Sequence, residues 1–230
     1  PEMSTTEYSA DVAQFLEPTA SIESDNVDVI AWAKDRAGDA VGEIEIAKRL
    51  YYAVRDEFTY DPYDFTLDHA GLSASGCLAR GKGFCVPKAA LLAACCRAVG
   101  IPARVGYADV RNHLTSKRLT EAMGTDLFVY HGYSELYLDG KWVKATPVFN
   151  KTLCEKARVL PMDFDGYNDS VFHPMNADGE KHMEYVHDHG PYADVPIDEI
   201  ATSFRELYPK LTGGKVSGGD FEVDAAANND

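Results

Sequence analysis

Residues 81–88 and the apolar run that follows them constrain the fold of this chain more than any other segment. Two glycines flank a lysine shortly before Cys85, which is typical of a turn that leads into a helix. Residues 89–99 are apolar on nearly every side, as expected for a helix at the centre of a protein. Gly100-Ile101-Pro102 then provides the stop signals of a helix. The segment predicts a central buried helix with a cysteine in its first turn.

Cys85 is the candidate nucleophile of this helix. A thiol in the first turn is favoured as the thiolate, because unpaired backbone N–H groups and the positive end of the helix dipole point at it. Cys95 and Cys96 lie inside the apolar run, where buried cysteines are usually inert small hydrophobic residues. Cys77 and Cys154 carry no functional signal, and we expect them to be structural or exposed free thiols.

The number and spacing of the cysteines indicate the redox environment in which the protein is expected. Five cysteines form an odd set without a pair of CxxC motifs, which argues against a structural zinc site or a disulfide framework. This usage fits a reducing environment, so we expect a cytoplasmic protein. No segment is long and apolar enough to suggest a membrane span.

Charge excludes some partners. A net charge of −15 argues against binding to nucleic acid or to an anionic membrane surface. Between Arg80 and Arg118, however, eight Lys or Arg residues accompany a single acid, Asp109. This basic segment has two interpretations. It consists either of solvated helix ends and loops, or of a local field that favours the thiolate and attracts an acidic substrate.

The rest of the chain predicts helices first and strands afterwards. Apolar residues at helical spacing indicate two helices before the cysteine helix, one capped by Asp25 or Asn26 and ended by Gly38, the other over residues 42–58. Later β-branched and aromatic runs predict strands at residues 103–108, 127–138 and 141–148. This order favours the α+β class, with the N-terminal helices and the buried cysteine helix packed on an antiparallel sheet.

The domain organisation follows from the same pattern. We expect a single domain over residues 1–212, with its core at 42–150 and a C-terminal elaboration at 151–212. The polar excursion over residues 109–126 is expected to fold over the site. Residues 213–230 are rich in Gly, Ala, Asn and Asp, and this composition predicts a disordered tail.

A hairpin provides a histidine for the cysteine. Asp139-Gly140 between two apolar runs is a strong signal for a two-residue turn. In the register that this turn sets, His131 lies opposite Val148. Thr146 and Asn150 are then its diagonal neighbours on the same face of the hairpin. The sequence thus predicts polar partners beside one histidine.

Four segments together carry a family signature: Gly81-Lys82-Gly83-Phe84-Cys85, Arg97-Ala98-Val99-Gly100-Ile101-Pro102-Ala103-Arg104-Val105, His131-Gly132-Tyr133-Ser134-Glu135-Leu136-Tyr137 with Gly140-Lys141-Trp142-Val143, and Val54-Arg55-Asp56-Glu57-Phe58-Thr59-Tyr60-Asp61. They resemble the core of the transglutaminase-like superfamily over about residues 45–150. The resemblance implies a papain-like α+β fold in which Cys85 is the nucleophile and His131 the general base.

One residue departs from the family pattern. The family usually places an Asp just before a Pro at the end of the second hairpin strand, and in this chain that position is Thr146. A third residue normally orients the imidazole and stabilises its cation. Asn150, on the same predicted face, is one candidate, and Thr146 is a weaker one. The remaining alternative is an acid from elsewhere, namely Asp61, Asp163 or Asp165.

The resemblance implies acyl transfer on an amide through a thioester. Cys85 attacks the carbonyl carbon, His131 protonates the leaving amine, and the backbone N–H of Cys85 holds the oxyanion with a second donor that the sequence does not identify. Water resolves the thioester in a peptidase or amidase, and an amine does so in a transglutaminase; a protein-glutamine deamidase is a further variant. We expect hydrolysis of a peptide or small amide, with acidic substrates among the candidates, because no second surface for an acceptor amine is evident. No metal or organic cofactor is required.

Two other function classes are kept as hypotheses. A non-catalytic binding module that retains the fold is supported only by Thr146. A metal hydrolase would be built on His182, His187 and His189, whose spacing matches neither HExxH nor a Cys/His knuckle. Hydrogen bonding within an acidic lobe is the simpler interpretation of these histidines.

Overall fold

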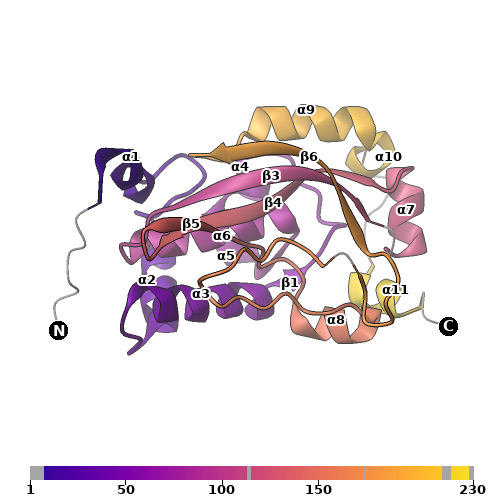
Figure 1. The fold of residues 1–230 in the computed structure, drawn as a ribbon. Coiled ribbons are helices and arrows are strands. Elements are labelled where there is room, and N and C mark those ends of the chain that lie inside the picture. Colours follow the sequence, from indigo (N-terminus) through magenta and orange to yellow (C-terminus); the bar gives the residue numbers. More distant parts are fainter. Residues whose placement is uncertain (1–7, 113–114, 174, 214–218, 228–230) are drawn as a thin grey trace.

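The computed structural model describes residues 8–112, 115–173, 175–213 and 219–227. It is an α+β fold with a four-stranded antiparallel sheet, and Figure 1 shows α2 and α3 on one side of this sheet and α9 on the other. The helices are α1 (Ala10–Ala13), α2 (Val27–Ala37), α3 (Glu43–Glu57), α4 (His69–Leu72), α5 (Ala74–Arg80), α6 (Cys85–Ala98), α7 (Lys117–Met123), α8 (Lys151–Ala157), α9 (Ile197–Leu207), α10 (Pro209–Thr212) and α11 (Phe221–Ala226), with a 3-10 turn η1 (Gln14–Leu16). The strands are β1 (Thr59–Tyr60), β2 (Lys82–Gly83), β3 (Ala103–Asn112), β4 (Leu127–Leu138), β5 (Lys141–Ala145) and β6 (Met183–Tyr192).

Helix α6 is the centre of the fold, as the sequence predicts. Thirteen of its 14 residues are buried, and it packs between the sheet and helices α2, α3 and α5. Gly81 adopts a left-handed conformation (φ 67°) that ends α5. A Cβ on Gly83 would lie 2.9 Å from the Cγ of Pro87, so only glycine fits there. At the other end, Gly100 (φ 86°) closes the helix, and the Ile101 N–H donates to the Cys96 carbonyl at 2.9 Å.

The sheet has the strand order β5-β4-β3-β6. The hairpin register predicted from Asp139-Gly140 is confirmed between the pairs Leu138 with Lys141 and Ser134 with Ala145. Strand β5 ends at Ala145, three residues earlier than predicted, because Pro147 has no N–H with which to continue the ladder. The predicted pairing of His131 with Val148 is therefore not part of the sheet.

Lysine 88 is an unexpected part of the core. Its side chain is fully buried on α6, and Nζ donates hydrogen bonds to the carbonyl oxygens of Arg55, Phe58 and Val148 at 2.9, 2.6 and 2.7 Å. Three acceptors match the three N–H groups of an ammonium. Lys88 thereby joins the end of α3 and the segment after β5 to the central helix.

The chain after residue 150 differs from its prediction in two places. Strand β6 pairs with β3 at the edge of the sheet, and the sequence did not reveal it because its residues are mostly polar and exposed. Residues 213–230 were expected to be disordered, but α11 packs on α8 and buries Phe221 and Ala225. The parts of this tail at 214–218 and 228–230 lie outside the described residues. Over the described ranges, no helix has the length and apolar character of a membrane span.

Candidate active site

Cys85 is the first residue of α6, and the residue is only 7% exposed. Backbone N–H groups of Gly132 and Val86 favour the thiolate form of its sulfur. Gly132 belongs to β4, and a Cβ there would lie 3.2 Å from the Cys85 carbonyl oxygen. A glycine at this position therefore lets the strand approach the helix start closely. Strand β4 and helix α6 meet at the thiol.

His131 follows a bulge in β4. His131 pairs with Ala108 of β3, and the next pair is Phe128 with Val110. Two residues of β4, Val129 and Tyr130, therefore lie opposite the single residue Asp109 of β3. Tyr130 takes up the strain with a positive φ of 51°, and its N–H donates to Asp109 Oδ1 at 3.0 Å. The bulge shifts the β4 residues before His131 out of the regular alternation that the sequence pattern predicts, whereas His131 keeps the register of the residues that follow it.

Cys85 and His131 line one cavity of about 30 Å³. This is room for one or two water molecules. Helix α7 contributes Leu119 and Met123, which confirms that part of the 109–126 excursion folds over the site. The other lining residues are almost all apolar or aromatic: Tyr60, Pro62, Phe65, Phe84, Phe128, Val129, Phe204, Tyr208 and Leu211. No hydrogen bond joins the thiol to the imidazole within the described residues.

Burial determines the charge of this pair. It raises the pKa of the Cys85 thiol to about 11, against the opposing effect of the backbone N–H groups. It also lowers the pKa of His131 to about 4, with a smaller contribution from His182. The helix terminus alone predicts a thiolate. In the closed cavity, loss of solvation is the larger effect, so both groups are uncharged at neutral pH.

The structure corrects the expectation for Asn150. The chain leaves the hairpin at Pro147, and Asn150 becomes the residue before α8. Its Oδ1 accepts the Tyr60 N–H at 2.9 Å, and its Nδ2 donates to Thr152 and Glu222, both at 2.7 Å. Asn150 lines neither of the cavities that His131 lines. It holds the backbone of Tyr60 instead of the imidazole.

The three alternative acids are also engaged elsewhere. Asp61 accepts hydrogen bonds from Lys82 Nζ and the Tyr63 N–H, both at 2.9 Å. Asp163 is exposed and pairs with Arg55, and Asp165 accepts the N–H groups after it in a turn. None of the three lines a cavity with His131.

Thr146 does lie beside His131, in a second cavity of about 10 Å³. His182, which immediately precedes β6, lines the same cavity. The Nε2 of His131 and the Oγ1 of Thr146 are both enclosed, and neither has a hydrogen-bond partner in the described parts of the chain. The structure thus brings two histidines and a threonine together where the family pattern has a carboxylate.

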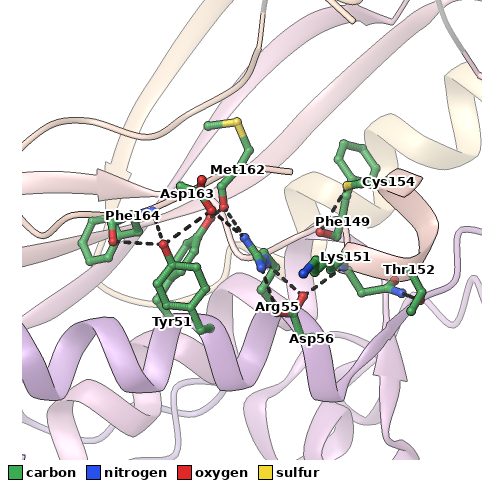
Figure 2. Close-up of polar contacts among 12 residues, drawn as sticks. Tyr51, Arg55, Asp56, Phe149, Lys151, Thr152, Cys154, Met162, Asp163 and Phe164 are labelled. Carbon is green, nitrogen blue, oxygen red and sulfur yellow. Dashed lines mark hydrogen bonds and ion pairs between the residues drawn. The ribbon is translucent and has the colours of Figure 1, made fainter. Parts of the chain in front are cut away.

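Helix α3 anchors the wall of this second cavity. The Tyr51 hydroxyl lies 3.0 Å from the Thr146 carbonyl oxygen and 2.8 Å from that of Met162. Arg55 Nη1 donates to the Met162 carbonyl at 2.7 Å, and Figure 2 shows this guanidinium between Asp56 and Met162. Thr146 and Met162 both line the cavity, so these contacts fix two of its walls.

The basic segment is balanced within the fold. Lys88 and Arg97 are both buried and donate to backbone carbonyl oxygens. The acceptors of the Arg97 guanidinium belong to Glu17, Ala103 and Ala193. Each of the other six faces a carboxylate: Arg80 and Lys82 (Asp64), Arg104 (Glu135), Arg111 (Asp126), Lys117 (Glu121) and Arg118 (Asp224). These contacts argue against the second interpretation of the segment, since its charges are compensated locally. The first interpretation is incomplete, because Lys88 and Arg97 are buried in α6 and Arg104 and Arg111 lie in strand β3.

The three histidines considered for a metal site, His182, His187 and His189, do not lie together in the fold. His182 lies in the second cavity, whereas His187 and His189 sit on the edge strand β6, where His189 contacts Asp109 at 2.7 Å. Across the described residues there is no group of three His, Cys, Asp or Glu side chains arranged to hold a metal ion.

Comparison with known proteins identifies the family. Residues 30–147, just over half of the chain, match the transglutaminase-like superfamily. The chain belongs to this superfamily. The fold of this transglutaminase-like chain resembles that of a candidate cysteine protease from Cytophaga hutchinsonii at 18% identity and a TM-score of 0.50, over 82% of this chain and 58% of that one.

A second solved structure is more distant. It is a candidate protease from Parabacteroides distasonis, with 16% identity and a TM-score of 0.41, covering 60% of this chain and 27% of that one. No protein of curated function matches the sequence. The transglutaminase-like chain spans 58% of the first of these structures, and at such identities the likeness concerns the fold.

Sequence reasoning missed two residues of this transglutaminase-like site. No sequence motif singles out Tyr60, and for His182 the sequence suggests only a metal site or hydrogen bonding within an acidic lobe. The signal for His182 was indirect. A threonine at the family's acidic position leaves the imidazole without the usual carboxylate, and no sequence pattern names a replacement.

Proposed function

We propose that this protein is a cysteine-dependent hydrolase of peptide or amide bonds, with Cys85 as nucleophile and His131 as general base. The observation that carries the proposal is the shared cavity, in which a thiol at a helix start and an imidazole on the adjacent strand line the same space. Membership of the transglutaminase-like superfamily supports it. The five cysteines are free thiols, which supports a reducing compartment such as the cytoplasm.

The resting pair is neutral, so the reaction begins with general-base catalysis. As the Cys85 sulfur attacks the carbonyl carbon, His131 takes the thiol proton. The tetrahedral intermediate then collapses: the carbon–nitrogen bond breaks, and the His131 imidazolium gives its proton to the leaving amine. Water, deprotonated by His131, hydrolyses the thioester and releases the acid.

Tyr60 is the second oxyanion donor in this proposal, beside the Cys85 N–H. Its ring lines the cavity, and burial raises the pKa of its hydroxyl well above the usual range, so the proton is retained. The hydroxyl of Tyr208, the other tyrosine of the cavity, is occupied by the Leu127 carbonyl and the Val129 N–H. The hydroxyl of Tyr60 makes no hydrogen bond to any described residue.

Replacing Tyr60 by phenylalanine tests this role. The loss of one oxyanion donor is expected to lower kcat by about 10²-fold to 10³-fold, with a small change in KM, because the hydrogen bond forms only in the transition state. Steady-state kinetics of Tyr60→Phe and of the control Tyr208→Phe give the comparison. Equal kcat values for wild type and Tyr60→Phe, in a variant of unchanged stability, would remove Tyr60 from the mechanism.

The cavity walls determine the preferred substrate. They are apolar, and the nearby basic side chains are already paired with acids, so the acyl side chain of the substrate is expected to be apolar or aromatic. A volume of about 30 Å³ does not hold such a group. Substrate entry therefore requires that the roof residues Leu119, Met123 and Leu211 move outward.

A panel of peptide p-nitroanilides that differ only in the acyl residue tests the function and this preference. We expect Phe or Leu derivatives to be cleaved with kcat/KM at least about tenfold above the Glu derivative. Addition of a primary amine during turnover reports on transamidation, because an amide product would replace part of the acid. Absence of cleavage of every member, with the protein folded and Cys85 reduced, would count against the hydrolase proposal.

A further inference from the structure

The second cavity beside His131 contains polar atoms that the proposed reaction has not used. It measures about 10 Å³, close to the space that one water molecule needs. The His131 Nε2 and the Thr146 Oγ1 are enclosed without a hydrogen-bond partner among the described residues. Buried polar atoms are normally paired in folded proteins. Because the His131 Nε2 and the Thr146 Oγ1 belong to residues of the same cavity, we expect each to form a hydrogen bond there, either to a bound water or during turnover.

His182 is the polar side chain that completes this cavity. It is 4% exposed, and its ring lies on Phe149 with the centroids 6.3 Å apart. It is close enough to His131 to contribute to the lowering of the His131 pKa. The His173 Nε2 lies 3.1 Å from the Pro161 carbonyl oxygen. The remaining lining residues are apolar, and none is a carboxylate: Phe149, Leu160, Met162, Val171, Phe172 and Met183.

The reaction creates a charge at this point. When Cys85 gives up its proton, an imidazolium forms on His131, and its second N–H needs an acceptor. A neutral imidazole has one acceptor nitrogen, and a threonine hydroxyl can accept as well as donate. The titratable groups around His131 are Cys85, Tyr60 and Tyr208 in the first cavity and His173 and His182 in the second; Asp178 and Glu180 line a further cavity with His182.

We propose that His182, together with Thr146, is the positioning residue of His131. In its neutral form His182 accepts a hydrogen bond from the His131 imidazolium, directly or through one water, so that a histidine and a threonine take the place of the family's aspartate. This inference rests on the proposed function, because it concerns the same general base. No bond other than hydrogen bonds changes at His182.

Alkylation of Cys85 by iodoacetamide tests the inference without a substrate. The rate is followed from about pH 5 to about pH 10, with the modified cysteine located by peptide mass spectrometry. His182→Phe keeps the packing on Phe149 but removes the acceptor, and we expect its rate at neutral pH to fall about 10-fold to 100-fold. His182→Gln retains an acceptor oxygen and is expected to recover part of the rate. The matched control is His187→Phe on the exposed edge strand, which should behave as wild type.

Thr146→Asp provides a gain-of-function arm. A carboxylate beside His131 favours the imidazolium and the thiolate partner, so alkylation below pH 8 should become faster in the wild-type background and in His182→Phe. The inference is overturned if His182→Phe and His182→Gln, both folded, keep the wild-type pH profile. If His131→Ala itself leaves the profile unchanged, the proposed function fails instead, because His131 is then not the base of Cys85.

Discussion

Replacement of Cys85 by alanine is expected to reduce amide hydrolysis by at least about 10⁴-fold, with little loss of stability. The side chain is small and sits at the first position of α6, so its removal leaves the helix and the cavity walls in place. What is lost is the sulfur that forms the thioester in the proposed mechanism. The measurement is kcat/KM with the best p-nitroanilide of the panel, beside a thermal unfolding curve.

Cys95→Ala is the matched control for this variant. Cys95 lies on the same helix and is fully buried, and burial raises the pKa of its thiol well above the usual range. The same chemical change at this position should leave kcat/KM within about a factor of three of wild type. Retained activity in Cys85→Ala, or an equal loss in both variants, would show that Cys85 is not the nucleophile.

Replacement of Lys88 by methionine is expected to lower the free energy of unfolding by about 3 kcal/mol or more. Methionine fills the same volume, but it leaves the carbonyl oxygens of Arg55, Phe58 and Val148 buried without their donor. These carbonyls belong to three separate segments, so the loss also loosens the end of α3 against the central helix. Urea unfolding followed by circular dichroism measures the change.

Lys82→Met serves as the comparison for Lys88. Lys82 pairs with Asp61 at 2.9 Å, yet 43% of its side chain is exposed, and surface ion pairs contribute about 1 kcal/mol at most. We therefore expect a small change for this variant. Similar losses for both lysines would mean that the three carbonyls find other donors and that Lys88 is not a structural centre.

The sequence predicted the helix frame because local signals and tertiary packing agree there. Asn26 caps α2 by accepting the Asp28 and Val29 N–H groups, and Gly38 follows its end, as the stop signals indicated. The Gly-x-Gly turn and the apolar run gave α6 and the place of Cys85 within it. The Asp-Gly turn fixed the hairpin register over five pairs of residues.

The structure around His131 depends on tertiary contacts that the local sequence indicates only weakly. The bulge at Tyr130 is held by Asp109, a residue of another strand, so the period-two pattern of β4 alone could not reveal it. Pro147 ended the ladder before His131, which separated Asn150 from the imidazole. The thiolate expectation failed for a similar reason, because the apolar side chains of α7, α9 and α10 that enclose the cavity come together only in three dimensions.

The residue that would replace the family's aspartate beside His131 shows most clearly what the sequence could not predict. His182 is 51 residues beyond His131 in the chain, next to an edge strand whose residues are mostly polar and exposed. Its approach to His131 follows from the pairing of β6 with β3, which no local pattern indicated. Thr146 is recognisable as unusual from the sequence, whereas the place of His182 in the same cavity emerges only from the packing.

Acid quenching of the wild-type reaction, followed by intact and peptide mass spectrometry, tests the central claim most directly. With a slowly hydrolysed Phe ester or anilide, we predict that the protein gains the mass of one acyl group, attached to the peptide that contains Cys85 and sensitive to hydroxylamine as a thioester. His131→Ala should accumulate little of this adduct. Product formation with no adduct on Cys85, or with the acyl group on Cys77, Cys95, Cys96 or Cys154, would contradict the account.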